Sequence, residues 1–265
     1  MNAQKLSHEL TIEESLTITL NLYANNFVKF FIPMLVASLV SGVSSAMLSD
    51  YFSSVEFPEV GAGTEAWNLF FSNIVVLLIA SLAFFVVALI ASAIAEGVCI
   101  KNTSNLVEKR ATNTGEALTF TVHKLLPLLA ASIITGILIG VGLVLLVVPG
   151  IIFAIMFSLA IPSIIIENVG VADSLSMSRK LVSNRWLKTF AFFIIIGVII
   201  LFVAVIAIFV AGPFGAFGSL AKNMVNSIVT AFAGPVVPIA VTVYYYSMKG
   251  RKQQQQVPPP PPPPF

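Results

Sequence analysis

Charged residues are scarce in this chain: only 10% of its 265 residues are Asp, Glu, Lys or Arg, whereas 57% are hydrophobic. A soluble domain carries about 25% charged residues. A chain this poor in charge cannot cover a water-facing surface, so the composition argues against a soluble protein. It predicts an all-α integral membrane protein with several spans, because helices satisfy their backbone groups internally in lipid.

Cysteine and histidine are nearly absent. The single Cys99 cannot form an internal disulfide or, by itself, a metal site. His8 and His123 have no second ligand at metal spacing, and no Ser or Cys is arranged with a base as a nucleophile. We therefore expect no enzymatic activity, no cofactor, no metal and no nucleic-acid partner. An intramembrane enzyme is kept only as the remaining alternative.

Two stretches of the chain resemble each other, 12–31 (IEESLTITLNLYANNFVKFF) and 171–190 (VADSLSMSRKLVSNRWLKTF). At a constant offset of 159 they share six identities in twenty positions. Each has an apolar stripe at helical spacing, which predicts an amphipathic helix in the membrane interface over 10–25 and 170–184. Asn25 and Asn184 are candidate helix terminators, because Asn tolerates the left-handed conformation. We call such an interfacial helix an elbow, and predict a repeated unit of elbow plus membrane hairpin, with a weaker third copy over 116–127 left open.

Six apolar stretches approach the roughly 20 residues needed to cross about 30 Å of hydrocarbon. The predicted spans are about 28–49, 67–96, 125–148, 151–167, 189–211 and 223–248. The Pro149-Gly150 pair predicts the turn between the third and fourth spans. Pro162 predicts a kink in the fourth span, and whether that short span crosses fully is left open. The sixth span is expected to kink at 234–238 and to end in an aromatic belt at 244–246.

Positive charge is distributed unevenly over this arrangement. Of the fourteen Lys and Arg residues, only Lys222 falls on one side of the six spans, and the other thirteen fall on the opposite side. The positive-inside rule therefore predicts that both termini lie in the cytoplasm. The expected location is the plasma membrane, and the resemblance described below implies a prokaryotic one.

The last residues, 253–265, consist of four glutamines, Val257, seven prolines and Phe265. A proline run adopts polyproline II and has no core to join, so residues 1–252 form the predicted membrane domain and 253–265 a disordered cytoplasmic tail. A partner with an aromatic-lined groove is one hypothesis for this tail, and a functionally quiet end is the other. The candidate partner contacts are Pro258, Pro261, Pro264 and Phe265.

Two groups of charged residues are candidate sites. Glu96 and Glu167, at the inner ends of the second and fourth spans, are candidate functional carboxylates. The alternative is that each pairs with a nearby Lys or Arg at headgroup depth. The cations of the two elbows are candidate contacts for anionic lipid headgroups, with generic anchoring as the alternative. They are Lys29, Arg179, Lys180, Arg185 and Lys188.

Three short motifs carry a family resemblance: Val148-Pro149-Gly150, Ile166-Glu167-Asn168, and the second elbow from Ser174-Leu175 to Asn184-Arg185-Trp186. Residues 140–200 resemble the membrane domain attached to some glycerophosphoryl diester phosphodiesterases and related bacterial and archaeal multi-pass proteins. The resemblance implies six helices with in-plane elbows and proximity to lipid metabolism. The 265 residues do not include the catalytic domain of the fused members, so phosphodiesterase activity is not implied.

Two functions remain open at this stage. The first is a non-enzymatic membrane scaffold or accessory subunit that contacts lipids through its elbows and a cytoplasmic protein through its tail. The alternative is a small-molecule or lipid transporter that uses the kinked fourth and sixth helices.

Overall fold

The structure is a computed structural model and describes residues 9–59, 61 and 63–256. Within these residues the regular secondary structure is entirely helical, with no strand. Six helices of this described part are long and apolar enough to cross a membrane. This confirms the all-α class and the predicted number of apolar crossing helices. The candidate tail contacts Pro258, Pro261, Pro264 and Phe265 lie outside the described residues.

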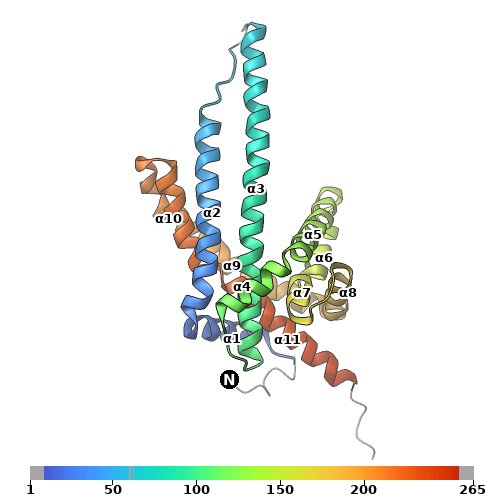
Figure 1. The fold of residues 1–265 in the computed structure, drawn as a ribbon. Coiled ribbons are helices and arrows are strands. Elements are labelled where there is room, and N and C mark those ends of the chain that lie inside the picture. Colours follow the sequence, from blue (N-terminus) through green and yellow to red (C-terminus); the bar gives the residue numbers. More distant parts are fainter. Residues whose placement is uncertain (1–8, 60, 62, 257–265) are drawn as a thin grey trace, which may run out of the picture.

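The order of the helices follows one pattern, in which a short helix precedes two crossings, and the described residues contain this pattern three times (Figure 1). Figure 1 shows the three short helices in the lower half of the view, away from the loop that joins α2 to α3. The first group is α1 (Ile12–Asn25), α2 (Phe27–Ser53) and α3 (Thr64–Val107). The second is α4 (Thr114–His123), α5 (Leu125–Leu145), and α6 (Val147–Phe157) with α7 (Ala160–Glu167). The third is α8 (Val171–Val182), α9 (Trp186–Ala211) with η2 (Gly212–Phe217), and α10 (Ser219–Ala233) with α11 (Val236–Gln256).

Local capping explains where the short helices begin and end. Thr11 and Glu14 form a capping box at the start of α1, and the Asn113 side chain accepts a hydrogen bond from the backbone N–H of Gly115 at the start of α4. Asn184 follows α8 with φ 65°, which confirms the predicted left-handed position. The same expectation at Asn25 is wrong, because Asn25 is still helical. The residue that follows α1, Asn26, has φ −132° and is not left-handed.

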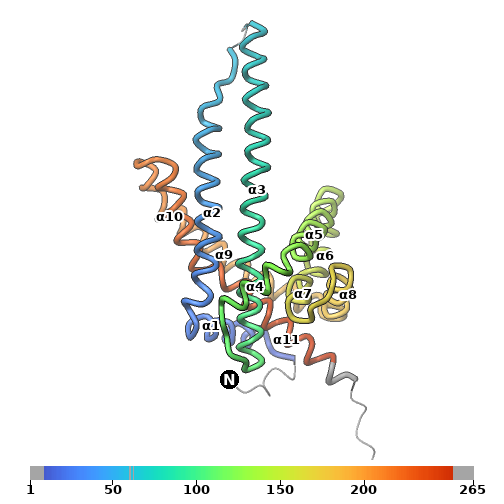
Figure 2. Tube along the Cα trace, viewed as in Figure 1, coloured from blue at the N-terminus to red at the C-terminus, as the bar shows by residue number. Residues whose placement is uncertain are grey.

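Helix α3 does not end at Glu96, where the charge pattern predicts the inner end of the second span. α3 continues to Val107, and most of the residues from Ala95 onward are buried among the other helices. Lys101 lies over the Phe120 ring of α4, with its Nζ 4.3 Å from the ring centroid. Glu96 therefore lies within α3 rather than at its end. Figure 2 shows the opposite end of α3 extending, beside α2, beyond the other helices.

The turn between α5 and α6 lies at Leu146, before the Pro149-Gly150 pair that predicted it. Pro149 sits in the first turn of α6, where a missing N–H costs nothing. Gly150 serves close packing instead of the turn, since a Cβ added to Gly142 would lie 2.8 Å from the Gly150 Cα. Because the turn comes earlier in the chain than predicted, the fourth crossing is longer than predicted and runs from Val147 to Glu167.

The fourth and sixth crossings are both broken near their middle. α6 and α7 are separated at Ser158 and Leu159, one turn before Pro162. α10 and α11 are separated at Gly234 and Pro235. Proline has no N–H and clashes with the carbonyl four residues earlier, which explains both breaks.

Hydroxyl groups of the short helices satisfy backbone groups at both breaks. At the first break, Ser178 of α8 donates to the Met156 carbonyl at 2.7 Å and accepts from the Leu159 N–H at 3.0 Å. At the second, Tyr23 of α1 donates to the Phe232 carbonyl at 2.8 Å. An unpaired backbone group is costly in hydrocarbon, so the short helices stabilise the broken crossings.

The middle of α11 forms much of the buried core. Tyr244 stacks on Phe192 with ring centroids 4.3 Å apart, and its hydroxyl lies 2.9 Å from that of Thr189. Both Tyr244 and Tyr245 are buried completely or almost so. The predicted aromatic belt at 244–246 is therefore wrong for these two residues, which pack inside the helix bundle.

Replacing Ser178 tests the support of the first break. In Ser178→Ala the Leu159 N–H and the Met156 carbonyl lose their partner, and we expect a loss of about 1–3 kcal/mol in the free energy of unfolding. Steric trapping of the full chain in bicelles measures this quantity. Ser176→Ala, at an exposed position of the same helix, is the matched control and should change stability little. Equal stabilities of the two variants would contradict the assignment.

Candidate functional site

Glu96 borders two cavities, which makes it the centre of the candidate site. The first, which we call the polar cavity, has a volume of about 370 Å³ and lies between α2, α3, α10 and α11. The second, which we call the apolar cavity, has a volume of about 590 Å³ and lies mainly between α5, α6, α9 and α11. Val237, just after the break between α10 and α11, also borders both cavities.

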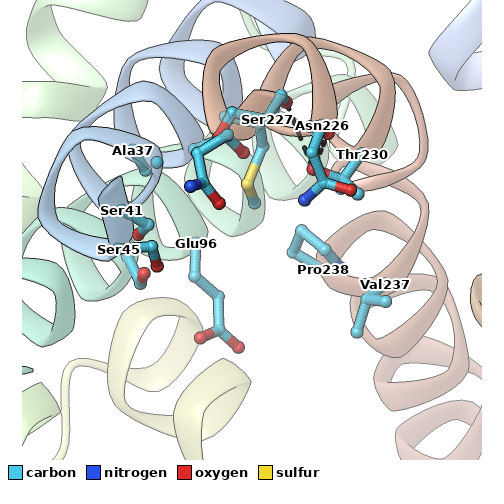
Figure 3. A pocket seen from close by; sticks show the side chains of 15 residues that line it. Ala37, Ser41, Ser45, Glu96, Asn226, Ser227, Thr230, Val237 and Pro238 are labelled. Atoms are coloured by element: carbon cyan, nitrogen blue, oxygen red, sulfur yellow. Dashed lines mark hydrogen bonds between the residues drawn. The ribbon is translucent and has the colours of Figure 1, made fainter. Parts of the chain in front are cut away.

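Hydroxyl and amide side chains line the polar cavity on opposite sides. Figure 3 shows Ser41 and Ser45 of α2 facing Asn226, Ser227 and Thr230 of α10 across the cavity, with Glu96 below and between them. Polar residues recur at helical spacing in both helices, so each presents a polar stripe within an apolar crossing. The stripes are Ser38, Ser41 and Ser45 in α2, and Asn223, Asn226 and Thr230 in α10.

A glycine contact holds the two polar stripes close together. A Cβ added to Gly42 would overlap the Ser227 Oγ and would lie 3.1 Å from the Asn223 carbonyl oxygen. Small residues allow membrane helices to approach closely where hydrophobic burial cannot drive association. The width of the polar cavity between α2 and α10 is therefore set by backbone contact at Gly42.

The break between α10 and α11 adds backbone acceptors beside the polar cavity. Pro235 and Pro238 have no N–H, so the carbonyls of Ala231 and Gly234, four residues earlier, lack the usual helical donor. Gly234 and Pro238 both border the polar cavity. The break thus supplies acceptor groups in the region that also contains the Glu96 carboxylate.

The apolar cavity has a different lining. Phe157, Phe190 and Phe193 contribute aromatic rings, and most of the remaining lining side chains are aliphatic. Its neutral polar side chains are Ser132, Thr135 and Ser158. An apolar chamber with a few polar groups is the usual form of a small-molecule site.

The two candidate carboxylates differ in their partners. Glu167 forms an ion pair with Lys249 and accepts a hydrogen bond from the Tyr245 hydroxyl at 3.0 Å. Among the described residues, none forms an ion pair or a hydrogen bond with the Glu96 carboxylate. A carboxylate inside the membrane that lacks a protein partner is a functional candidate. Glu96 is therefore the stronger of the two candidates, and Glu167 has the cationic partner that the alternative interpretation expects.

Several elbow cations contact other parts of the protein. Arg185 and Lys188 bind Glu9, with Nε–Oε1 at 3.0 Å and Nζ–Oε1 at 2.6 Å, and Lys29 donates to the Thr112 hydroxyl. Arg179 and Lys180 lie on the exposed side of α8 and remain the candidates for lipid headgroups. The clamp around Glu9 joins residues far apart in sequence, so periodicity within one helix could not reveal it.

The His, Cys, Asp and Glu side chains of the described residues are dispersed. Within the part of the chain that the structure describes, no three His, Cys, Asp or Glu side chains lie close enough together to hold an ion. Glu96 is the one charged side chain among the described residues that line the two cavities.

Comparisons of the chain with protein-family models, with curated proteins and with solved structures find no match. The family resemblance of residues 140–200 therefore stays a prediction.

The Glu9 clamp gives a prediction about pH. Burial alone would raise the pKa of Glu9, but the hydrogen bonds and positive charges of Arg185 and Lys188 lower it below its ordinary value of 4.5. A carboxyl whose pKa is lowered by folding stabilises the protein above its unfolded-state pKa, and this contribution is lost as pH falls through the folded-state pKa. We expect Glu9→Gln to melt below the wild-type protein at pH 6–7.

The melting temperatures of the two proteins should converge as the pH falls through the folded-state pKa of Glu9, which lies below 4.5. Scanning fluorimetry of the detergent-solubilised chain measures both. Glu13→Gln, at an exposed acidic position of the same segment, is the matched control and should follow the wild-type curve. A constant difference between wild type and Glu9→Gln across this range would contradict the clamp.

Proposed function

We propose that the chain is a multi-pass membrane transport protein whose substrate binds at Glu96, between the polar and apolar cavities. One observation carries the proposal: a carboxylate without a protein partner lies among the apolar crossings, where two cavities of different polarity meet. A scaffold needs no such arrangement, because an unpartnered carboxylate in this setting only costs stability. A transport site needs a group that binds the substrate within the membrane.

The broken crossings support this function. α10 and α11 separate beside the polar cavity, and α6 and α7 separate at Ser158, which borders the apolar cavity. Transporters commonly build substrate sites from discontinuous helices, because the unwound backbone supplies polar groups and allows the two halves to move. Here each break lies at one of the two cavities that meet at Glu96.

The short helices support the predicted orientation and repeat. Four and eight residues after the capping positions of α1, α4 and α8, small residues are buried. These residues are Ser15 and Thr19, Ala117 and Thr121, and Ser174 and Ser178. We infer three copies of one elbow-plus-hairpin unit, with the elbows in the cytoplasmic interface and both termini in the cytoplasm, because all but one of the cations lie on that side in the predicted arrangement.

The scaffold hypothesis depended on the tail and on the elbow cations. Of the tail, residues 253–256 form the end of α11, and 257–265, with all four candidate contacts, lie outside the described residues. Three of those cations have protein partners, so transport is the function that the geometry supports better.

Cysteine accessibility tests transport without knowledge of the substrate. Ser92 borders the polar cavity one helical turn before Glu96. In a Cys99→Ala background we expect Ser92→Cys to react with a membrane-impermeant, positively charged methanethiosulfonate added to either side of oriented vesicles. Reaction from both sides is expected because a transport site opens to each side in turn.

Val198→Cys is the matched control, since Val198 is exposed on α9 and borders neither cavity, so it should remain unlabelled in lipid. Labelling of Ser92→Cys from one side only would indicate a receptor or a binding subunit. Labelling from neither side would contradict both transport and a water-accessible site.

A further inference from the structure

The charge and the shape of the Glu96 site specify a class of ligand. We propose that the site binds an amphipathic primary ammonium, with the ammonium group at Glu96 and the hydrocarbon part in the apolar cavity. This inference rests on the transport function proposed above and identifies the substrate class of the same site.

The charge of the lining selects a cation. Among the described residues that border either cavity, Glu96 is charged, and Lys, Arg and His do not occur. A negative ligand would therefore meet an unpaired carboxylate with no opposing positive charge. A positive ligand supplies the partner that the described part of the protein does not, and forms a charge-assisted hydrogen bond with the carboxylate.

The neutral polar groups favour an ammonium group with several N–H donors. A primary ammonium has three N–H donors and no acceptor, the same inventory as a lysine side chain. The carboxylate of Glu96 accepts one of these bonds. Serine and threonine hydroxyls and the asparagine amide oxygens of the polar cavity are further acceptors, as is the Gly234 carbonyl, which Pro238 leaves without its helical donor. A quaternary ammonium would leave these acceptors unused.

The apolar cavity selects the other end of the ligand. Phe157, Phe190 and Phe193 lie among aliphatic side chains, and the cavity of about 590 Å³ begins at the same carboxylate. Sites of this size hold small organic molecules and bury most of their surface. An aromatic or branched hydrocarbon group attached to the ammonium therefore fits the second cavity while the charged group stays at Glu96.

Other classes of ligand would use only one part of the site. A proton or inorganic cation would use Glu96 but would leave the apolar cavity without a role. A neutral lipid chain would use the apolar cavity but would leave the carboxylate unpaired. The adjacent positions of the two features favour one molecule that carries both a positive charge and a hydrocarbon group.

Binding of 2-phenylethylammonium to the full chain in nanodiscs tests the inference. Two analogues of nearly the same shape serve as comparison ligands: neutral 2-phenylethanol and anionic 3-phenylpropionate. Titration calorimetry, corrected with empty nanodiscs, should show binding of the ammonium at least about 10-fold tighter than that of the alcohol, because only the ammonium pairs with a carboxylate. The anion should not bind.

Two variants locate the site. Glu96→Gln should abolish the preference for the ammonium over the alcohol, whereas Glu65→Gln, at the far end of the same helix, should leave it unchanged. Phe193→Leu should weaken binding of both phenyl ligands by a similar factor. Gel filtration and melting temperature verify that each variant is folded, and Glu96→Asp, which keeps the charge, should retain part of the preference.

Equal affinities for the ammonium and the alcohol, or an unchanged preference in Glu96→Gln, would overturn the inference. The labelling of Ser92→Cys distinguishes this failure from failure of the transport function. If Ser92→Cys reacts from both sides while no ammonium binds, transport stands and its substrate belongs to another class. If Ser92→Cys reacts from neither side and no ammonium binds, both proposals fail.

Discussion

A carboxylate surrounded by apolar helices must be neutralised by a cation or a proton, because isolated charge is expensive in a medium of low dielectric constant. In the proposed site Glu96 takes this position, and no described residue forms an ion pair with it. The other features of the site are arranged around this carboxylate. The polar cavity gives it hydrogen-bonding surroundings, and the apolar cavity begins beside it.

The short helices allow such a site to exist in an otherwise apolar bundle. Broken helices leave backbone groups without their helical partners, and those that face apolar surroundings need partners from the protein. Ser178 and Tyr23 provide partners at the two breaks. The Glu9 clamp joins the start of α1 to the start of α9. The short helices α1 and α8 and the residues next to them thus combine two roles, since they stabilise the breaks and connect distant parts of the chain.

The number of crossings was predictable, because hydrocarbon thickness fixes the length of apolar runs. The break near Pro162 was predictable from a local rule, because proline lacks the N–H that a helix interior needs. The turn at Leu146 was not, because the Pro149-Gly150 pair suits both a turn and the first turn of a helix. The pairing of Glu9 with Arg185 and Lys188 was not predictable either, because it joins distant segments that no local pattern connects.

Glu96 was predicted as a candidate residue, but its two cavities were not. The spacing of serines in α2 and of asparagines in α10 could have indicated the polar one, had uncharged polar residues been treated separately from apolar ones.

Photoaffinity labelling tests the central claim most directly. The full chain in nanodiscs is illuminated with an aryl-diazirine analogue of 2-phenylethylammonium, and the labelled residues are mapped by mass spectrometry. The account predicts labels on the residues of α6, α9 and α11 that line the apolar cavity. These labels should be strongly reduced in Glu96→Gln and should be lost in the presence of excess 2-phenylethylammonium. Labelling spread over the lipid-facing surfaces of the crossings, and unchanged in Glu96→Gln, would contradict a binding site at Glu96.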